Sequence, residues 1–476
     1  MIFQTADLLH NDPDNFTSKR KGRSRYTRLK VKQPIRNILI HGSPFVITIN
    51  AKGKLCLLRQ RSILISDGVI KDVYPASDIK KVDLTKIDLI YDAEQRGGIV
   101  VTPGFINAHS HPPMYLLRGA LVLMEDDLDK ALAGMAELEG AMTENDFFIG
   151  SLGDLTEQQK SGITTTVSHY GVFEPIDEAA RLANQRVINA ISAVSNSHPE
   201  NTPALIGRYA RNAGQWYTTP AAAIHYVYKA SPAQLKRIAS IVNKHKLLFT
   251  LHIAETEKTI ARCYQAHGDH PIAVLDKYKL LSKRTLLSHC VHVTAKEIRL
   301  IKLRGAAVVH LPTSNLLHNT GKFNYPLFYK MHATKQIALG TDSVVSKNRL
   351  DLLSEALQTK TMHQSKKIVP YSYLFNMITA QGARLISRPD LGRIAHGYQA
   401  DIAFWKLKDR GFLPYDEDNP ETLVANMITH GGRSIRDLMI NGQFIISNRM
   451  HNLVDESALL SALQSSHMAL RKRLRK

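Results

Sequence analysis

The feature that most constrains the fold is a series of eight apolar, β-branched segments between residues 98 and 343. They read GIVVTPGFINAHSH, GITTTVSHY, RVINAISAVS, AAAIHYVY, LLFTLHIAE, TLLSHCVHV, AAVVHLPTS and QIALGTDS. Amphipathic stretches separate them, such as SPAQLKRIASIVNKHK, in which Ser231 supplies a hydroxyl cap and Pro232 suits the first helical position. Hydrophobic strands that alternate with helices in this way predict an α/β fold of the (β/α)8 TIM-barrel type over residues 99–387.

Strand-like segments flank this region on both sides. Residues 35–98 contain short runs rich in Ile, Val and Leu, with turn signals such as Asp67-Gly68 between them. Residues 388–455 contain further runs, joined by the hairpin signal Asn441-Gly442. The simplest arrangement pairs the two sets in one small composite β-sandwich, with the barrel inserted between them. Residues 456–476 are predicted to form a basic, amphipathic C-terminal helix.

Composition places the chain among soluble globular proteins. Of its 476 residues, 44% are hydrophobic and 22% are charged, and no uninterrupted apolar run is long enough to span a bilayer. The first residues lack the basic and apolar blocks of a secretory signal. The three widely spaced cysteines do not suggest a disulfide framework. We therefore expect a cytoplasmic protein without a membrane partner.

The formal charge of +20 is concentrated at the two ends of the chain. Residues 19–36 carry nine basic residues and no acidic one, and the last six residues carry five more. A basic N-terminal tail over residues 1–34 suits nucleic acid, anionic lipid or an acidic partner. No nucleic-acid recognition motif accompanies the charge, so a solvated tail is the simpler interpretation and nucleic-acid binding is not expected as the main function.

Ionisable side chains end several of the predicted barrel strands. In a barrel of this type the carboxyl ends of the strands carry the chemistry. The first strand ends with His109 and His111, whose alternate positions point both imidazoles to one side. The other strand-end groups are His225, His252, Glu255, His289, His292 and Asp342.

Each of these groups also has an ordinary structural interpretation. A single histidine at the end of a buried strand is usually a hydrogen-bonded core residue, and an aspartate after Gly-Thr is usually a turn or a helix cap. So many ionisable groups at one barrel mouth are costly to bury without a shared partner. Three imidazoles and a carboxylate suit one divalent metal ion such as zinc, with Glu255 and His289 left for proton transfer. Iron and manganese remain alternatives to zinc.

Five motifs make the chain resemble the amidohydrolase superfamily. They are TPGFINAHSHPPMYLLRG, LHIAET, SHCVHVT, LPTSN and LGTDS, and the resemblance runs in order from about residue 35 to residue 450. The branch of triazine hydrolases and of S-adenosylhomocysteine and methylthioadenosine deaminases is the most similar. The resemblance implies the following sites: metal ligands His109, His111, His252 and Asp342; a proton shuttle at Glu255; His289 beside the reacting water or substrate; and a substrate contact at His225.

The chain departs from the family pattern where the substrate should bind. The tryptophan-containing segment that follows Arg118-Gly119 in the family is absent, and the seventh-strand motif has Leu311 where the family has asparagine. Arg118 and Asn315 join His225 as the predicted substrate-binding residues. These departures leave the identity of the substrate open.

The predicted activity is hydrolytic deamination of an amino-substituted nitrogen heterocycle of purine, nucleoside, pyrimidine or triazine type. Asp342 would take a proton from the water, Glu255 would protonate the substrate, and His289 would orient the attacking oxygen. An amidase or a dehalogenating hydrolase on the same scaffold is the main alternative. A non-catalytic scaffold and a nucleic-acid-binding protein are further alternatives from other classes. The partner is a small-molecule substrate, and the resemblance favours a homodimer.

Overall fold

The computed structural model of the protein describes residues 35–120, 128–195, 197–346, 349–364, 369–430 and 435–475. The predicted basic tail at residues 1–34 lies outside this set, as do residues 121–127 of the segment after the first barrel strand. Among the described residues, no helix has both the length and the apolar character that a membrane crossing requires.

Eight parallel strands form the predicted barrel, and each of the eight apolar segments contributes one of them. In sheet order they are β6 (Phe105–Ser110), β7 (Ile163–Tyr170), β8 (Arg186–Ser192), β9 (Thr219–Ala223), β10 (Phe249–Ile253), β11 (Thr285–His289), β12 (Ala307–His310) and β13 (Ile337–Leu339). A parallel bridge between Ser110 and Asp342 links the two ends of this sheet. The (β/α)8 prediction is therefore confirmed.

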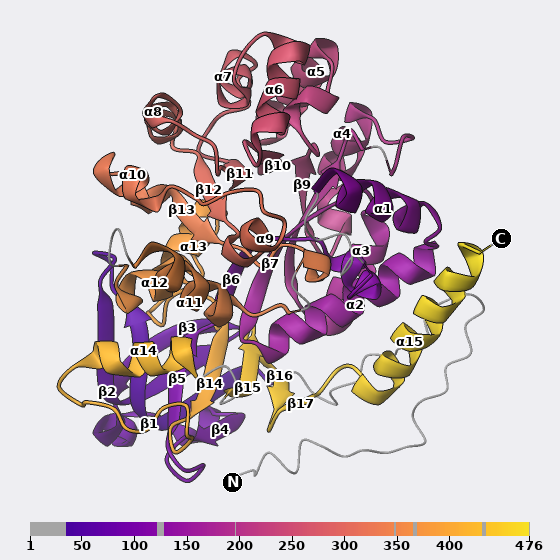
Figure 1. The fold of residues 1–476 in the computed structure, drawn as a ribbon. Helices are drawn as coiled ribbons and strands as arrows, with labels where there is room; N and C mark the ends of the chain where they lie inside the picture. The colour runs from indigo at the N-terminus through magenta and orange to yellow at the C-terminus, as the bar shows by residue number, and fades with distance from the viewer. Residues whose placement is uncertain are drawn as a thin grey trace.

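Helices surround the barrel and connect its strands (Figure 1). They are α1 (Leu128–Gly140), α2 (Glu144–Lys160), α3 (Glu174–Ala183), α4 (Pro203–Arg211), α5 (Pro232–His245), α6 (Glu257–His267), α7 (Pro271–Lys277), α8 (Ala295–Arg304), α9 (Pro312–Leu317), α10 (Tyr325–Lys330), α11 (Leu352–His363), α12 (Tyr371–Met377) and α13 (Ala380–Leu385). The expected start of α5 is confirmed, because Ser231 accepts from the backbone N–H of Gln234 and Pro232 is the first helical residue.

Strands from both ends of the chain form a second sheet, which lies below the barrel in Figure 1. Its order is β17 (Met450–His451), β16 (Gln443–Ser447), β15 (Ile435–Ile440), β14 (Ile402–Lys406), β5 (Ile99–Pro103), β1 (Asn37–Ile49), β2 (Leu55–Ser66) and β3 (Val69–Pro75), with β4 (Leu89–Asp92) paired to β1. The antiparallel pair of β14 and β5 joins the C-terminal set to the N-terminal set. This is the predicted composite β-domain, and α14 (Pro420–Thr429) belongs to the same C-terminal segment.

The first predicted strand is in fact two strands that belong to different sheets. β5 pairs with β14 and β1, whereas β6 pairs with β7 of the barrel. Gly104 separates them, and a Cβ atom at this position would lie 2.2 Å from the side chain of Thr164. The close approach of the two layers therefore requires glycine at the passage between them.

The Asn441-Gly442 hairpin and the C-terminal helix follow their predictions. Asn441 and Gly442 have φ values of 52° and 73°, the left-handed conformation of a tight hairpin turn. The helix α15 (Glu456–Arg473) is capped by Asp455 and packs beside α2 on the flank of the barrel (Figure 1).

Candidate metal-dependent active site

Three histidine side chains converge at the mouth of the barrel. The Nε2 atoms of His109 and His111 are 3.1 Å apart, and the Nε2 atom of His252 lies 3.2 Å from that of His109 and 3.3 Å from that of His111. His109 is the next-to-last residue of β6, His111 follows it by two residues, and His252 lies in β10. All three side chains are buried.

This arrangement fits one divalent ion better than it fits hydrogen bonds between the rings. The Nδ1–H group of His111 donates to the carbonyl oxygen of His169 at 2.6 Å, so its Nε2 atom carries a lone pair toward the other two rings. In a tetrahedral zinc site with zinc–nitrogen distances of about 2.0–2.1 Å, ligand nitrogens lie about 3.3 Å apart. The observed spacing matches this value, and the three residues form a candidate metal-binding group.

Burial keeps two of these three imidazoles in the form that binds metals. Burial, followed by the effect of His111, holds the pKa of His109 well below its ordinary value. Burial and the neighbouring His169 do the same to the pKa of His252. His109 and His252 are therefore neutral, which is the ligand form of imidazole. Burial lowers the pKa of His111 as well, but the adjacent carboxylate of Asp342 outweighs it and raises that pKa.

Asp342 completes the group from the loop after β13. Its Oδ1 atom lies 3.3 Å from Nε2 of His111 and 3.8 Å from Nε2 of His109. Burial alone would raise the pKa of Asp342, but the neighbouring His111 and the other nearby imidazoles hold it well below its ordinary value. The buried carboxylate therefore stays ionised and favours a cation between itself and the rings.

Glu255 and His289 lie beside the histidine cluster, and each is held by one neighbour. The Tyr226 hydroxyl donates to Oε2 of Glu255 at 2.5 Å. The Nδ1–H group of His289 donates to Oδ1 of Asn315 at 2.8 Å. The remaining atoms, Oε1 of Glu255 and Nε2 of His289, face each other at 3.7 Å.

A cavity opens over this cluster. Its lining residues are His111, Met114, Leu132, Met135, His225, Tyr226, His252, Glu255, His289, Ser314, His318, Asp342 and Ser343. Leu132 and Met135 come from α1, so that helix contributes an apolar wall. The cavity therefore combines an ionisable floor with an apolar side, as small-molecule sites do.

The predicted substrate-binding residues occupy three different places. His225 lines the cavity directly. Asn315 does not belong to the lining and reaches the site through His289. Arg118 lies outside the lining, where its guanidinium group pairs with Glu157 of α2 and lies 4.4 Å from the ring centre of Tyr115.

Sequence analysis did not identify several residues that lie at this site. Tyr226 and Lys229 follow His225 within one turn, and Ser288 lies 3.0 Å from Nδ1 of His109. His169 is the next-to-last residue of β7, and its ring stacks on His252 with centres 4.7 Å apart. The rule that polar residues ending strands meet at the mouth would have identified His169, whereas Tyr226 and Ser288 carry no such signal.

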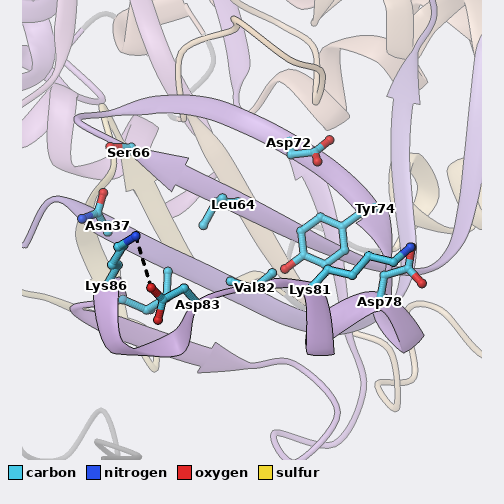
Figure 2. Close-up of a pocket in the computed structure, with 11 residues that line it drawn as sticks. Asn37, Leu64, Ser66, Asp72, Tyr74, Asp78, Lys81, Val82, Asp83 and Lys86 are labelled. Carbon is cyan, nitrogen blue, oxygen red and sulfur yellow. Dashed lines mark hydrogen bonds and ion pairs between the residues drawn. The ribbon is translucent and has the colours of Figure 1, made fainter.

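A larger hollow lies in the composite β-domain, between β1, β2, β3 and the short turns that follow (Figure 2). Its acidic residues include Asp78 and Asp83, which pair with Lys81 at 2.9 Å and with Lys86 at 3.2 Å. No histidine lines it. Because these carboxylates already have partners, this hollow does not compete with the histidine cluster as a catalytic site.

The chain is similar to known hydrolases over most of its length. The sequence model of the Amidohydrolase family matches residues 100–445. A 5-methylthioadenosine/S-adenosylhomocysteine deaminase from Syntrophomonas wolfei is 29% identical over 429 residues, which cover 87% of this chain and 95% of that protein.

Solved structures share the fold at lower identity. An adenosine deaminase from Xanthomonas campestris with bound zinc has a TM-score of 0.80 at 22% identity, covering 91% of this chain and 98% of that one. An atrazine chlorohydrolase from Arthrobacter aurescens TC1 complexed with zinc has a TM-score of 0.79 at 21% identity, covering 90% of this chain and all of that one, 100%. The match of the family model to most of the chain shows that this protein belongs to the amidohydrolase family.

Proposed function

We propose that the protein is a metal-dependent aminohydrolase that releases ammonia from an amino-substituted nitrogen heterocycle. The observation that carries this proposal is the approach of three buried Nε2 atoms to within 3.3 Å of one another, beside Glu255 and His289. The deaminases among the similar proteins support the same class of reaction. The substrate class is a purine, nucleoside, pyrimidine or triazine.

His109, His111, His252 and Asp342 would hold one divalent ion. Zinc is the ion that we propose, supported by the nitrogen spacing and by the zinc in the two similar structures. When bound, such an ion supplies Lewis acidity and lowers the pKa of water toward neutrality.

The remaining steps belong to side chains of this protein. Glu255 Oε1 protonates the ring nitrogen next to the amino-bearing carbon, which makes that carbon electrophilic. Tyr226 holds the other oxygen of Glu255, so Oε1 stays available to the substrate. Asp342 accepts a proton from the attacking water, and Nε2 of His289 orients that water. Asp342 then passes its proton to the amino nitrogen, the hydroxyl oxygen returns its remaining proton to Glu255, and ammonia leaves as the carbonyl forms.

The proton-transfer pair favours an amine over a halide as the leaving group. An amine must be protonated before it leaves, whereas a halide needs no proton. Glu255 and His289 are both buried beside the histidine cluster and could supply that proton. This favours deamination over dehalogenation.

The test is an ammonia-release screen of purified, zinc-loaded protein. The panel contains adenine- and guanine-type bases and nucleosides, methylthioadenosine, S-adenosylhomocysteine, cytosine, aminotriazines and a chlorotriazine. We expect ammonia from at least one amino heterocycle. Chloride release from the chlorotriazine without ammonia from any compound would contradict the proposal.

Glu255→Gln is the first variant to examine. It should keep its zinc and lower kcat by about 10²- to 10⁴-fold, because the amide cannot transfer the proton. Glu257→Gln makes the same chemical change on an exposed residue two positions along the chain and should keep full activity. Undiminished turnover in Glu255→Gln would disprove the assigned role.

A further inference from the structure

Lys229 makes a contact that determines which nitrogen of His225 carries hydrogen. Its Nζ atom lies 3.1 Å from Nδ1 of His225, four residues earlier in the chain. An ammonium group only donates hydrogen bonds, so Nδ1 must act as the acceptor and carry no hydrogen. The short helix η7 (Val227–Lys229) places the two side chains together.

The other nitrogen of His225 then becomes a donor to the cavity. A ring that accepts a hydrogen bond at Nδ1 has no hydrogen there and is therefore neutral. A neutral ring without hydrogen on Nδ1 carries it on Nε2. His225 lines the cavity, and its one side-chain hydrogen bond within the described residues is the bond to Lys229. Its Nε2–H group is therefore free for a ligand.

Lys229 has no competing role in the described part of the chain. No carboxylate of those residues lies within 4.0 Å of its Nζ atom, and its other close neighbour is the ring of Tyr226 at 5.8 Å. The side chain is partly buried. Its ammonium group is thus directed at His225 and is not engaged in a surface ion pair.

We propose that Lys229 is a positioning residue that holds His225 as the Nε2–H tautomer, so that the cavity selects substrates with a hydrogen-bond acceptor facing the end of β9. The selection of substrates rests on the proposed function, whereas the tautomer does not. Acceptors of this kind are a ring nitrogen, a carbonyl oxygen or a sugar oxygen. A heterocycle that presents N–H at this position would face a second donor and bind poorly.

Nuclear magnetic resonance tests the tautomer without any substrate. Zinc-loaded, full-length protein with ¹⁵N-labelled histidine gives long-range correlations that distinguish the two ring nitrogens, and the His225→Gln spectrum identifies the signals of His225. We expect Nε2–H in the native protein and in Lys229→Arg. Lys229→Glu supplies an acceptor instead of a donor and should move the hydrogen to Nδ1. An Nδ1–H tautomer in the native protein would overturn the role of Lys229.

Kinetics with the best substrate from the screen tests the selection. Lys229→Met should raise KM about tenfold, the effect of one lost hydrogen bond, with kcat within about twofold of native. Lys229→Arg should restore KM to within about threefold. In a His225→Gln background, Lys229→Met should have no further effect, because the group through which Lys229 acts has gone. An unchanged KM in Lys229→Met, or a loss confined to kcat, would overturn the proposal.

The two proposals fail in different ways. If the native protein releases no ammonia from the panel while its spectrum shows Nε2–H at His225, the proposed function fails and the tautomer assignment stands. If ammonia is released but the spectrum shows Nδ1–H, the assignment to Lys229 fails and the deaminase assignment stands.

Discussion

Single neighbouring groups hold three histidines of the site in defined tautomers. A carbonyl oxygen accepts from Nδ1 of His111, the Asn315 amide oxygen accepts from Nδ1 of His289, and Lys229 donates to Nδ1 of His225. The first two rings therefore present a lone pair on Nε2, and the third presents an N–H group. In the function that we propose, metal binding, proton transfer and substrate binding therefore each use a histidine, but in different tautomers.

The Asn315 contact leads to a prediction at the residue scale. Asn315→Ala removes the acceptor that orients His289, so kcat should fall by about 10²-fold or more while the zinc content stays native. Asn315→Asp keeps an acceptor oxygen and should lose much less activity. Steady-state kinetics and metal analysis of both variants provide the test. Equal losses in the two variants would mean that Asn315 does not act through an accepted hydrogen bond.

Backbone conformation at the site was beyond prediction from local sequence. His289 and Asp342 have φ values of 75° and 58°, a region that residues with a side chain rarely adopt. Bonds between neighbouring strands hold these conformations: the N–H group of Cys290 donates to the carbonyl of Ile253, and that of Asp342 donates to the carbonyl of His109. Such strain depends on the partner strand, which no single segment of sequence specifies.

At the scale of elements, α15 supports the segment that follows the first two histidines. The short helix η5 (Pro112–Leu117) comes directly after His111, and Nδ1 of His467 in α15 donates to the carbonyl of Leu116 at 3.0 Å. Arg473 donates to the carbonyl of Ala141 at 2.8 Å. The C-terminal helix was predicted from its amphipathic pattern, but its position against η5 was not, because the pattern does not name a partner.

A substitution at Leu470 tests whether α15 packs against the rest of the protein. Its side chain is 0% exposed, whereas that of Leu460 in the same helix is 63% exposed. Leu470→Ala should lower the free energy of unfolding by about 2–5 kcal/mol, because it leaves a cavity in packed surroundings. Leu460→Ala should change it by no more than about 0.5 kcal/mol. Thermal and urea unfolding of the two variants measure this difference, and similar losses would contradict the packing of α15 described above.

At the scale of the whole molecule, the buried Asp154 of α2 makes the stability of the protein depend on pH. Asp154 is fully buried, and this burial raises its pKa to about 8. Its pKa in the unfolded chain is about 3.9. Between these two pH values the unfolded state releases a proton that the folded state keeps, so stability decreases as pH rises.

The variant Asp154→Asn isolates the contribution of this carboxyl group to the pH dependence of stability. The asparagine resembles the protonated acid and does not titrate, so its unfolding free energy should lack the decrease between about pH 4 and pH 8. The native protein should lose stability relative to the variant by up to about 1.4 kcal/mol per pH unit in that window, with no further change above it. Thermal unfolding of both proteins across the pH series provides the measurement. Parallel curves for the two would show that Asp154 does not titrate in this way.

The barrel and the composite β-domain form one molecule through contacts between distant segments. Arg186 in β8 pairs with Asp401, which precedes β14, at 2.7 Å. The ring centres of Phe105 and Trp405 lie 5.7 Å apart across the same boundary. The composite sheet was predictable because strand-like runs flank the barrel on both sides. The division at Gly104 was not predicted, because the apolar residues on the two sides of Pro103-Gly104 were assigned to a single strand.

The sequence by itself determined the number and order of the barrel strands, the composite β-domain and the ionisable residues that end the strands. These follow from apolar periodicity and turn residues, which are local properties of the chain. Only the tertiary structure decided which end groups meet at one point, which nitrogen of each ring faces it, and that Arg118 pairs with Glu157 outside the cavity lining. The physical reason is that barrel closure brings together atoms from β6, β9, β10, β11 and the loop after β13, and distances of about 3 Å between them depend on the packing of the whole barrel.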